Sequence, residues 1–577
     1  MSRPSRRALA ALVLAAMTVT AGCAAVDGSD ATPADTADIG FERVPDAAGL
    51  DYVDDGEGGA GNGDAGVYVA DYDRDGWPDV LASGGEGPAL FHNAGGEFER
   101  SGALPPVDRS IKSAAWVDFD GDGWPDLLLL PRDGAPVALE NREGTFARVD
   151  VGLGNVSHPL GAAAADYDGD GDDDLFVYQS GDWTERKPAG YFSLDKQVVD
   201  DNGYPNRLYE NVDGTYRRVD DAGIDGDRWS LAASFVDLTG DGRPDIHVAN
   251  DYNNDTLYVN EGDGTFDQRH LGGATARNGM SSEVADVTGD ARPDVFVTNI
   301  HIPITRGTVG RERYERLKHL FRFVIKSERT KGNTLLVNEF GEGAGTAGGA
   351  GGASAGLVDR ADEYGVRDGG WGWAATAADL DNDGDRDLLH ATQNVVRLDR
   401  DDPVYTYPMV FERGGDGFDR LDADARGFAE DDGRGVVAVD YDRDGDLDVI
   451  SANYLSEFTV YENTAVGSAP DANALTVRVA AADGTTDLGA TVEVDAGDAS
   501  TTLHGSSRTD FLSQEPRASH VGLAAHESAT LHVTWSDGTE RTFEDVAAGR
   551  VVRVMPDGVE TVLTYRDPDG ASDGTDD

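Results

Sequence analysis

The stretch Asp118-Phe119-Asp120-Gly121-Asp122-Gly123-Trp124-Pro125-Asp126 decides the fold, because close variants of it occur seven times along the chain. Its pattern, D-x-D-x-D-G-x-x-D, places side-chain oxygens at positions 1, 3, 5 and 9 and a glycine at position 6. Ca²⁺ is a hard cation that takes about 6–8 oxygen ligands, and a glycine lets the chain turn so that alternate residues point inward. The spacing therefore predicts one calcium-binding loop in each copy.

Five copies carry all four aspartates, and two carry threonine at position 3. The complete sets are Asp71/Asp73/Asp75/Asp79, Asp118/Asp120/Asp122/Asp126, Asp166/Asp168/Asp170/Asp174, Asp379/Asp381/Asp383/Asp387 and Asp440/Asp442/Asp444/Asp448. The weaker sets are Asp237/Thr239/Asp241/Asp245 and Asp286/Thr288/Asp290/Asp294, and in the last of these Ala291 replaces the glycine. A neutral hydroxyl attracts a dication less than a carboxylate does, so we expect up to seven Ca²⁺ sites, five of them strong. Chance aspartate clustering or a polar turn would explain one such loop, but not seven in the same context.

Composition excludes some partners. The 577 residues allow more than one domain, and the formal net charge of −60 makes nucleic acid an unsuitable partner, because a surface this negative repels phosphate. Only six of the 48 basic residues are lysines. An acid-rich, lysine-poor surface resembles that of proteins from organisms living in strong brine, where carboxylates stay hydrated and their repulsion is screened. We therefore attribute most of the charge to the environment rather than to a binding site.

The N-terminus predicts export. Arginines precede an apolar run, residues 8–19, that is short for a membrane span, and small residues follow it. Ala21-Gly22-Cys23 resembles a lipobox, which would make Cys23 the lipid-modified first residue, and residues 5–9 resemble a twin-arginine signal. We therefore expect a signal peptide over residues 1–23 and a flexible acidic tether over 24–40, in a cell-surface lipoprotein that meets the membrane only through its lipid. An uncleaved anchor, or a plain secretory signal with a chance cysteine, is the alternative.

The loops alternate with short apolar segments typical of β-strands. Each unit has a strand that ends at the first aspartate, a second strand after the loop, a third that ends near an asparagine, and a fourth that follows a glycine-containing turn. Seven such units predict a seven-bladed β-propeller over residues 41–465. The segment Phe41-Glu42-Arg43-Val44 precedes every loop, so we expect it to complete the blade that contains Asp440 and to close the ring. An open solenoid would leave it unpaired.

The loop and hairpin together resemble the FG-GAP/VCBS repeat, which also builds integrin α-subunit propellers. The resemblance implies that the position-7 carbonyl is a further calcium ligand, here at Trp77, Trp124, Asp172, Asp385 and Asp446. Residues 470–565 resemble the ASPIC/UnbV domain through Leu475–Val479, Leu488–Val494, Phe511-Leu512-Ser513-Gln514 and Val533–Gly538. The whole is similar to the cartilage acidic protein 1 family in its short microbial form, although Ser536 stands where that family usually has proline and its cysteines are absent.

Alternating apolar residues in Leu475–Val479 and Thr530–Trp535 independently predict a small C-terminal β-sandwich. The acidic tail, residues 566–577, is expected to be disordered. Two insertions, 181–204 and 301–332, interrupt the repeat. The second contains a basic amphipathic stretch, Arg311–Lys326, which we expect to form a helix that packs on the propeller; docking on an anionic glycan, a lipid surface or a partner is the alternative.

No catalytic residues are identifiable. The eleven histidines form no H-E-x-x-H motif, and no nucleophile elbow or Ser/His/Asp set is evident. His504, His520, His526 and His532 gather in the C-terminal domain, where packed or surface positions are the simpler interpretation. The sequence thus favours surface recognition or adhesion, with an extracellular glycan or protein as ligand. A polysaccharide lyase, hydrolase or other enzyme that uses the propeller funnel is the competing hypothesis.

Overall fold

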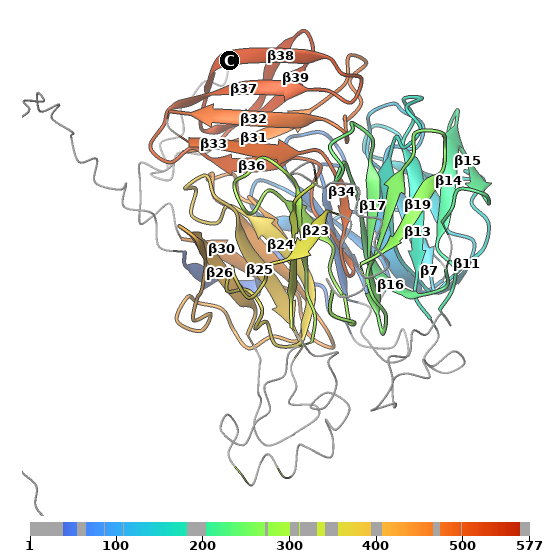
Figure 1. Cartoon of the computed structure of the whole chain (residues 1–577), viewed down its shortest axis with the longest axis horizontal. Helices are drawn as coiled ribbons and strands as arrows, with labels where there is room; N and C mark the ends of the chain where they lie inside the picture. Colours follow the sequence, from blue (N-terminus) through green and yellow to red (C-terminus); the bar gives the residue numbers. More distant parts are fainter. Residues whose placement is uncertain are drawn as a thin grey trace, which may run out of the picture. The chain divides into compact units, whose positions relative to one another are not determined.

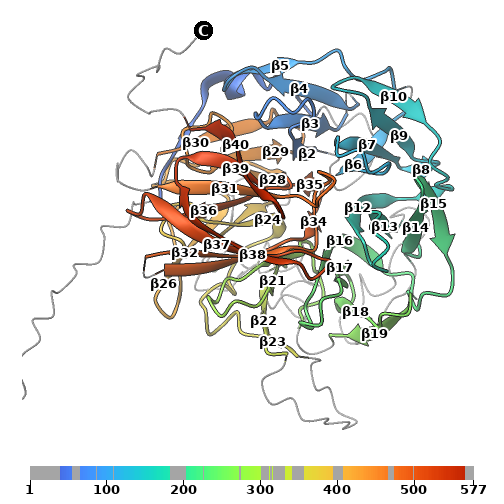
Figure 2. The ribbon, with the colours of Figure 1, turned by 90° about the horizontal axis from the view of Figure 1, so that it is seen from above.

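Seven antiparallel four-stranded sheets surround a common centre in the computed structural model (Figure 1, Figure 2). The structure describes residues 39–54, 65–85, 87–107, 109–181, 203–224, 226–271, 275–300, 311, 315, 332–340, 356–393, 407–464, 473–497 and 499–565. The chain divides into Met1–Asp35, which is outside these ranges, and Thr36–Asp577, which contains them all. The architecture is the β-propeller with a C-terminal β-domain that the repeats predict.

The strands of each blade follow one another from the centre outward. Blades 1 to 3 are β2 (Gly66–Ala70), β3 (Asp79–Ser83), β4 (Ala89–Asn93), β5 (Phe98–Arg100); β6 (Ile111–Val117), β7 (Asp126–Pro131), β9 (Val137–Asn141), β10 (Phe146–Val149); and β12 (Pro159–Ala165), β13 (Asp174–Gln179), β14 (Arg207–Val212), β15 (Thr215–Val219). Blades 4 and 5 are β16 (Trp229–Val236), β17 (Asp245–Asp251), β18 (Thr256–Asn260), β19 (Phe266–His270); and β20 (Glu283–Ala285), β21 (Asp294–Val297), β22 (Thr334–Asn338), β23 (Leu357–Asp359). Blade 6 is β24 (Gly372–Ala378), β25 (Asp387–Thr392), β26 (Met409–Gly414) and β27 (Gly417–Arg420).

Blade 7 joins the two ends of the repeat region. It consists of β28 (Gly433–Val439), β29 (Asp448–Asn453), β30 (Thr459–Asn463) and, as its outer strand, β1 (Phe41–Arg43). Phe41 is in register with Asn463, and its ring lies 4.6 Å from that of Phe428. The predicted pairing of this segment is confirmed, so the first residues of the repeat region complete the last blade.

Small residues are frequent in some of the innermost strands. The strand β12, Pro-Leu-Gly-Ala-Ala-Ala-Ala, is buried along its whole length, and β24 is similarly rich in alanine. Strands crowd toward the centre, so side chains there have to be short for neighbouring backbones to approach. Larger apolar residues, such as Phe91 and Leu128, pack between the sheets in separate clusters. The propeller is therefore held by contacts between adjacent blades.

The C-terminal domain is a sandwich of two four-stranded sheets. One sheet has the order β36-β31-β39-β40 and the other β33-β32-β37-β38. Their bounds are β31 (Ala474–Val479), β32 (Thr491–Ala496), β33 (Ala499–His504), β36 (Ser519–Gly522), β37 (Ser528–Thr534), β38 (Glu540–Ala547), β39 (Arg550–Met555) and β40 (Gly558–Thr564). Inward residues alternate with outward ones along β37, and Leu475, Leu531 and Trp535 contribute to the shared core, as the sequence pattern predicts.

A segment between β33 and β36 leaves this sandwich and enters the centre of the propeller. It contains β34 (Ser507–Thr509), which pairs antiparallel with β16, and β35 (Ser513–Gln514), which pairs parallel with β2 (Figure 2). We call residues 507–515 the central plug. The run Phe511-Leu512-Ser513-Gln514, which the sequence assigned only to the C-terminal domain, therefore packs inside the propeller, and Phe511 and Leu512 are buried there.

The central plug reaches the innermost part of every blade. Beyond the two strand pairings, its side chains accept backbone N–H bonds at five further blades. These bonds run from Trp116 to Gln514 (2.7 Å), Ala164 to Ser507 (2.9 Å), Ser282 to Asp510 (3.0 Å), Ala375 to Asp510 (2.6 Å) and Ala438 to Glu515 (3.5 Å). A Cβ atom at Gly435 would lie 2.6 Å from the carbonyl oxygen of Leu512, so this glycine is needed for the close approach.

Some sequence predictions concern residues outside the described ranges. These are the signal peptide with Cys23, nearly all of the tether, the acidic tail and most of both insertions, including the amphipathic stretch apart from Arg311 and Glu315. Within the part of the chain that is described, no helix combines the length and apolarity needed to cross a membrane.

Candidate metal centres

Each of the seven loops turns twice through the left-handed backbone region. Position 6 has positive φ in every loop, at six glycines with φ between 81° and 101° and at Ala291 with φ 65°. Position 4 also has positive φ, for example 60° at Arg74 and 70° at Gly121. A side chain in this region costs about 1 kcal/mol, so Ala291 bears strain that glycine avoids. The loop at Asp286 thus follows the same path as the others at some cost.

The first aspartate of the loop organises its backbone. In blade 3, Asp166 accepts N–H bonds from Gly169, Asp170 and Gly171 at 2.7–3.1 Å. The same arrangement recurs at Asp237 and Asp286. Backbone donors thus fix the carboxylate at position 1, leaving its remaining lone pairs for a cation.

The ninth residue connects the loop to the third strand. In every loop its Oδ2 accepts the N–H of position 2, and its Oδ1 accepts the N–H of the third-strand residue at 2.7–2.9 Å. In six blades this third-strand residue is asparagine, whose side chain also donates to a carbonyl in the loop of the preceding blade. Asn93 donates to Tyr441 in this way at 2.7 Å, so the bond closes the ring between blades 1 and 7. Position 9 therefore has a structural role in addition to the predicted ligand role. The ninth residues are Asp79, Asp126, Asp174, Asp245, Asp294, Asp387 and Asp448.

Predicted ligand side chains converge in four of the loops. One oxygen from each member lies within 4.8 Å of the others in the sets Asp71/Asp73/Asp79, Asp118/Asp120/Asp122, Asp166/Asp168/Asp174 and Asp379/Asp381/Asp383. Several buried oxygens in these loops have no hydrogen-bond partner; they include Oδ1 of Asp71, Asp73 and Asp381, both oxygens of Asp440, and Oγ1 of Thr239. A buried polar atom without a partner costs about 1–3 kcal/mol, more when it is charged. Oxygen donors that lack protons and point together fit a hard cation such as Ca²⁺.

Burial makes these carboxylates unfavourable as free anions. It raises the pKa of Asp79 and Asp174 to about 9 and that of Asp126 to about 8, and neighbouring aspartates raise the pKa further. The pKa of Asp448 is raised well above its ordinary value for the same two reasons. Either a proton or a cation has to offset the negative charge in each loop.

Arginine enters the two loops that carry threonine. Position 7 is Arg243 in blade 4 and Arg292 in blade 5, and each forms an ion pair with the aspartate at position 5 of its own loop. The distance from Arg292 Nη2 to Asp290 Oδ2 is 2.5 Å. An internal guanidinium thus neutralises one of the three remaining carboxylates, which is a second reason, unnoticed in the sequence, to expect weaker cation binding there.

Two predicted ligands at position 5, Asp241 and Asp444, have surroundings that the sequence motif does not reveal. Asp241 in blade 4 is exposed, and Arg243 occupies both of its oxygens: the backbone N–H donates to Oδ1 at 3.2 Å, and the guanidinium pairs with Oδ2. Arg243 thus already offsets the charge of Asp241, and the role of Asp241 as a ligand in one of the two weaker loops stays a prediction.

Asp444 in blade 7 is half-buried and faces other acids. Its negative charge raises the pKa of both Asp442 and Asp446. Its Oδ1 also accepts the backbone N–H of Asp446 at 3.2 Å. The sequence placed Asp444 in a set with Asp440, Asp442 and Asp448, beside the carbonyl of Asp446, and this assignment stays a prediction. Asp444 belongs to a larger acidic cluster, because Asp446 contributes its side chain and not only a carbonyl.

Sequence reasoning missed a fifth acidic position beside the loop. The residue before the third-strand asparagine is Glu140, Glu210 and Glu462 in blades 2, 3 and 7, and Glu412 holds the corresponding place in blade 6. Each of these glutamates lies close enough to the position-3 aspartate to raise its pKa. In blades 4 and 5, where position 3 is threonine, the residue is Val259 or Val337. The covariation within one chain shows that this residue belongs to the loop's charge environment.

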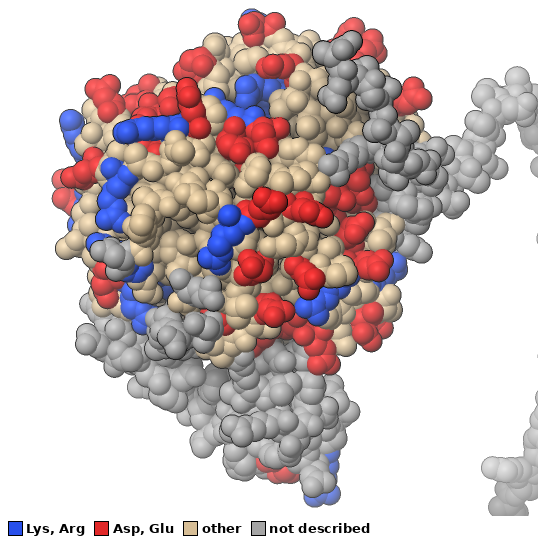
Figure 3. All heavy atoms as spheres, turned by 180° about the vertical axis from the view of Figure 1, so that it is seen from behind, with Lys and Arg blue, Asp and Glu red and all other residues tan. Residues whose placement is uncertain are grey.

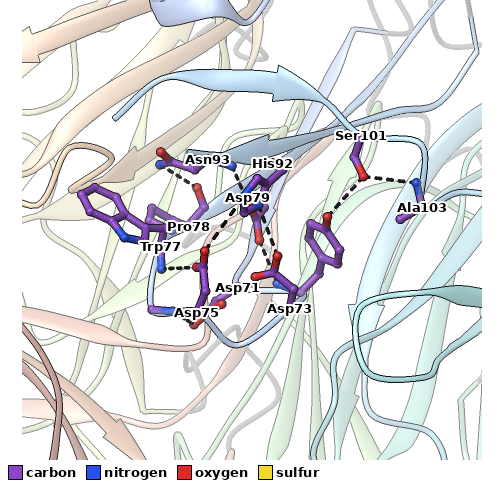
Figure 4. Close-up of polar contacts among 12 residues, drawn as sticks. Asp71, Asp73, Asp75, Trp77, Pro78, Asp79, His92, Asn93, Ser101 and Ala103 are labelled. Atoms are coloured by element: carbon purple, nitrogen blue, oxygen red, sulfur yellow. Dashed lines mark hydrogen bonds and ion pairs between the residues drawn. The ribbon is translucent and has the colours of Figure 1, made fainter. Parts of the chain in front are cut away.

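Blade 1 departs from this pattern, because the residue before its third-strand asparagine is His92. The imidazole lies among the carboxylates of the loop (Figure 4). Its Nδ1 is 3.2 Å from both Asp73 Oδ2 and Asp79 Oδ1. In blade 7 the further acid is Asp446, whose side chain is buried with an unpartnered Oδ1. Blades 1 and 7 thus each add a side chain that is not at one of the four ligand positions of the motif.

The C-terminal domain covers the loops of blades 6, 7 and 1. Gly522 donates its N–H to Asp379 Oδ2 at 2.7 Å, and Arg478 donates to Asp71 Oδ2 at 2.8 Å. Asp379 and Asp440 are consequently buried, whereas Asp120 and Asp168 are exposed. Among the C-terminal histidines, His520 is buried at this contact and its Nε2 lies 2.7 Å from Asn382 Oδ1, while His532 is half-buried. A cavity of about 70 Å³, lined partly by Arg386, lies beneath the domain.

Comparison with known proteins identifies both parts of the chain. Residues 71–129, 118–177 and 237–297 match the FG-GAP-like repeat, and residues 482–561 match the family described as ASPIC and UnbV. No curated protein matches the chain. The chain thus carries FG-GAP-like repeats and an ASPIC/UnbV domain, and its propeller is of the integrin-like type.

Proposed function

We propose that this protein is an exported, membrane-anchored, calcium-binding propeller that acts in recognition or adhesion at a cell surface. Cys23 would carry the lipid, and the ligand would be an extracellular glycan or protein. The similarity to the cartilage acidic protein 1 family and the adaptation to strong brine belong to the same proposal. On the face in Figure 3, acidic and basic side chains are interspersed.

The side chain of Asp440 carries the calcium part of the proposal. It is 2% exposed, and neither of its oxygens has a hydrogen-bond partner. Its nearest paired cation, Arg443 Nη1, is 3.8 Å away, beyond hydrogen-bond distance. A buried carboxylate is retained in proteins when it is paired, hydrogen-bonded or bound to metal, and here only the last of these leaves no oxygen unsatisfied. In other loops backbone N–H groups already bond to the position-1 carboxylate, and there the unpartnered buried oxygens of Asp71, Asp73 and Asp381 support the same proposal.

Calcium would contribute much of the stability. Extracellular calcium modules bind with dissociation constants of roughly 10⁻⁴–10⁻³ M, and a free concentration about 100 times the dissociation constant adds about 2.7 kcal/mol for each site. Five such sites would together add about 13.5 kcal/mol, which is comparable to a typical net stability of about 5–15 kcal/mol. The metal would supply charge neutralisation, and the loop aspartates would hold it between the first two strands of each blade.

Chelation tests the calcium part directly. The melting temperature of the full chain is measured in excess calcium and in excess chelator, at constant ionic strength. A large loss on chelation, reversed by added calcium, is expected. The variant Asp120→Ala should lose less than chelation but more than Asp537→Ala, an exposed aspartate outside the loops. A melting temperature insensitive to the chelator would refute the assignment.

The central plug bears on the choice between recognition and catalysis. An enzyme of the propeller funnel needs open space at the centre, and there the plug bonds to every blade. This supports recognition by the outer surfaces instead. A glycan array with the calcium-loaded protein is the test: binding without turnover is expected, and product release from an acidic polysaccharide would favour the enzyme.

A further inference from the structure

The loop of blade 1 has a ligand set unlike those of the other six loops. In the equivalent place four blades have glutamate and two have valine, whereas blade 1 has His92. The set Asp73/Asp75/His92 converges within 4.8 Å, and so does Asp71/Asp73/Asp79 (Figure 4). Blade 1 is thus the loop in which a nitrogen donor joins carboxylates.

The geometry around the imidazole suits a small ion. The edge of a tetrahedron is about 3.3 Å when the metal–ligand bonds are about 2.0–2.1 Å, the length typical of zinc bound to histidine or carboxylate. Nδ1 of His92 lies 3.2 Å from Asp73 Oδ2 and 3.2 Å from Asp79 Oδ1. The imidazole of His92 is carried by strand β4. The next residue of that strand, Asn93, donates its backbone N–H to Asp79, so the backbone fixes the positions of both His92 and Asp79.

A second observation points to a ligand at this place. The side chain of Asp71 is 8% exposed, and its Oδ1 has no hydrogen-bond partner, although Arg478 and Gly76 both donate to its Oδ2. A buried Oδ1 of Asp73 is likewise without a partner. A bound cation would satisfy these two buried oxygens, which Arg478 does not reach with a hydrogen bond.

Ligand chemistry then selects the ion. Calcium takes oxygen donors, whereas imidazole suits zinc, copper, nickel and iron, which bind nitrogen more strongly than calcium does. We propose that the blade-1 loop, through Nδ1 of His92 with Asp73 and Asp79, is a site for a divalent transition metal such as Zn²⁺, while the remaining loops take calcium. Asp75 faces the other ring nitrogen, Nε2, at 4.0 Å and is not counted among the ligands. The inference rests on the cation binding proposed above, and it assigns to one loop an ion of a different class.

The chain provides its own matched controls. His92→Glu gives blade 1 the residue found in blades 2, 3 and 7, and Glu140→His places an imidazole beside the complete loop of blade 2. The untagged full-length protein and both variants are dialysed against excess calcium with a few equivalents of zinc, and bound metals are counted by mass spectrometry. Cobalt in place of zinc provides an absorption spectrum sensitive to nitrogen ligation.

The wild-type protein should retain one more zinc per chain than His92→Glu, and Glu140→His should gain one. Only the wild-type and Glu140→His proteins should show the cobalt signature. Equal zinc content in the wild-type and His92→Glu proteins would overturn the proposal and leave His92 as a protonated partner of the aspartates. The calcium count in the same samples separates this failure from that of the calcium proposal, which would show as no calcium bound by any of the three proteins.

Discussion

Replacing Asp510 tests whether the central plug holds the blades together. Its two carboxylate oxygens accept the backbone N–H groups of Ser282 in blade 5 and Ala375 in blade 6, at 3.0 and 2.6 Å. Alanine would leave both N–H groups buried and unpaired. Each unpaired group costs about 1–3 kcal/mol, so Asp510→Ala should lose about 2–6 kcal/mol, a large part of a typical net stability.

Urea unfolding in saturating calcium measures this loss. The ring of Trp373 lies 4.5 Å from that of Phe511, so tryptophan fluorescence reports on the plug as well as on global unfolding. Asp537→Ala is the control, because Asp537 is exposed and bonds only within its own turn, to Thr539. If Asp510→Ala lost no more stability than Asp537→Ala and kept the wild-type fluorescence, the plug would not be the element that connects the blades.

Three further predictions follow from individual contacts. Burial raises the pKa of Asp510 from 3.8 to about 8, so the folded protein binds a proton that the unfolded chain releases; the associated stability is complete below about pH 4 and is lost as the pH rises through about 8. In urea titrations from about pH 5 to pH 9, the wild-type protein should therefore lose stability relative to Asp510→Asn, and parallel profiles would contradict this. Asn93→Ala removes the bond to Tyr441 that closes the ring, and it should cost about 1–3 kcal/mol of stability in thermal unfolding. Asn338→Ala, at the equivalent link between blades 5 and 4, should cost a similar amount. If Asn93→Ala had no effect on stability, β1 alone would close the ring. Arg292→Gln frees Asp290 and should raise calcium affinity in calorimetric titration, whereas unchanged affinity would show that Thr288 or Ala291 limits the site.

The repeats allowed most of the propeller to be predicted. Each loop is a local motif, and the strands follow it at nearly fixed spacing, so the pairing of Phe41 with Asn463 could be inferred from a count of outer strands. The covariation of the third-strand residue with position 3 was also available in the sequence. It was overlooked because His92 is 13 residues from Asp79, beyond the nine residues of the loop motif.

The surroundings of individual ligands were harder to predict than the loops themselves. Asp241 and Asp444 occupy the same motif position as Asp122, yet one is paired with Arg243 and the other raises the pKa of Asp446 through its negative charge. Both partners stand at position 7, where the motif constrains only the backbone carbonyl. A pattern of ligand positions therefore predicts where the carboxylates gather, but not which of them a neighbouring side chain already engages.

The central plug could not have been predicted from the repeats. Asp510 is 228 residues from Ser282 and 135 from Ala375, and no repeat links these positions. Phe511 and Leu512 look like ordinary core residues of a β-domain, and Gly435 looks like one more small residue in an inner strand. Only the three-dimensional arrangement shows that these residues are complementary, because the plug follows no period and contacts each blade through a different side chain.

Aspartates in the loops beneath the C-terminal domain accept hydrogen bonds from that domain in addition to being predicted metal ligands. Asp379 accepts the N–H of Gly522 while it also faces Asp381 and Asp383. Asp71 likewise accepts a hydrogen bond from the guanidinium of Arg478 and lies close to Asp73 and Asp79. Without a cation, the mutual repulsion of these carboxylates is relieved by protonation or by movement of the loop, and either change alters an acceptor on which the C-terminal domain rests. The loops of blades 2 and 3 differ in that their position-3 aspartates, Asp120 and Asp168, are exposed, so solvent screens that part of their charge. Cation binding in blades 6 and 1 is therefore expected to be coupled to the seating of the C-terminal domain, whereas cation binding in blades 2 and 3 stabilises mainly the blade itself.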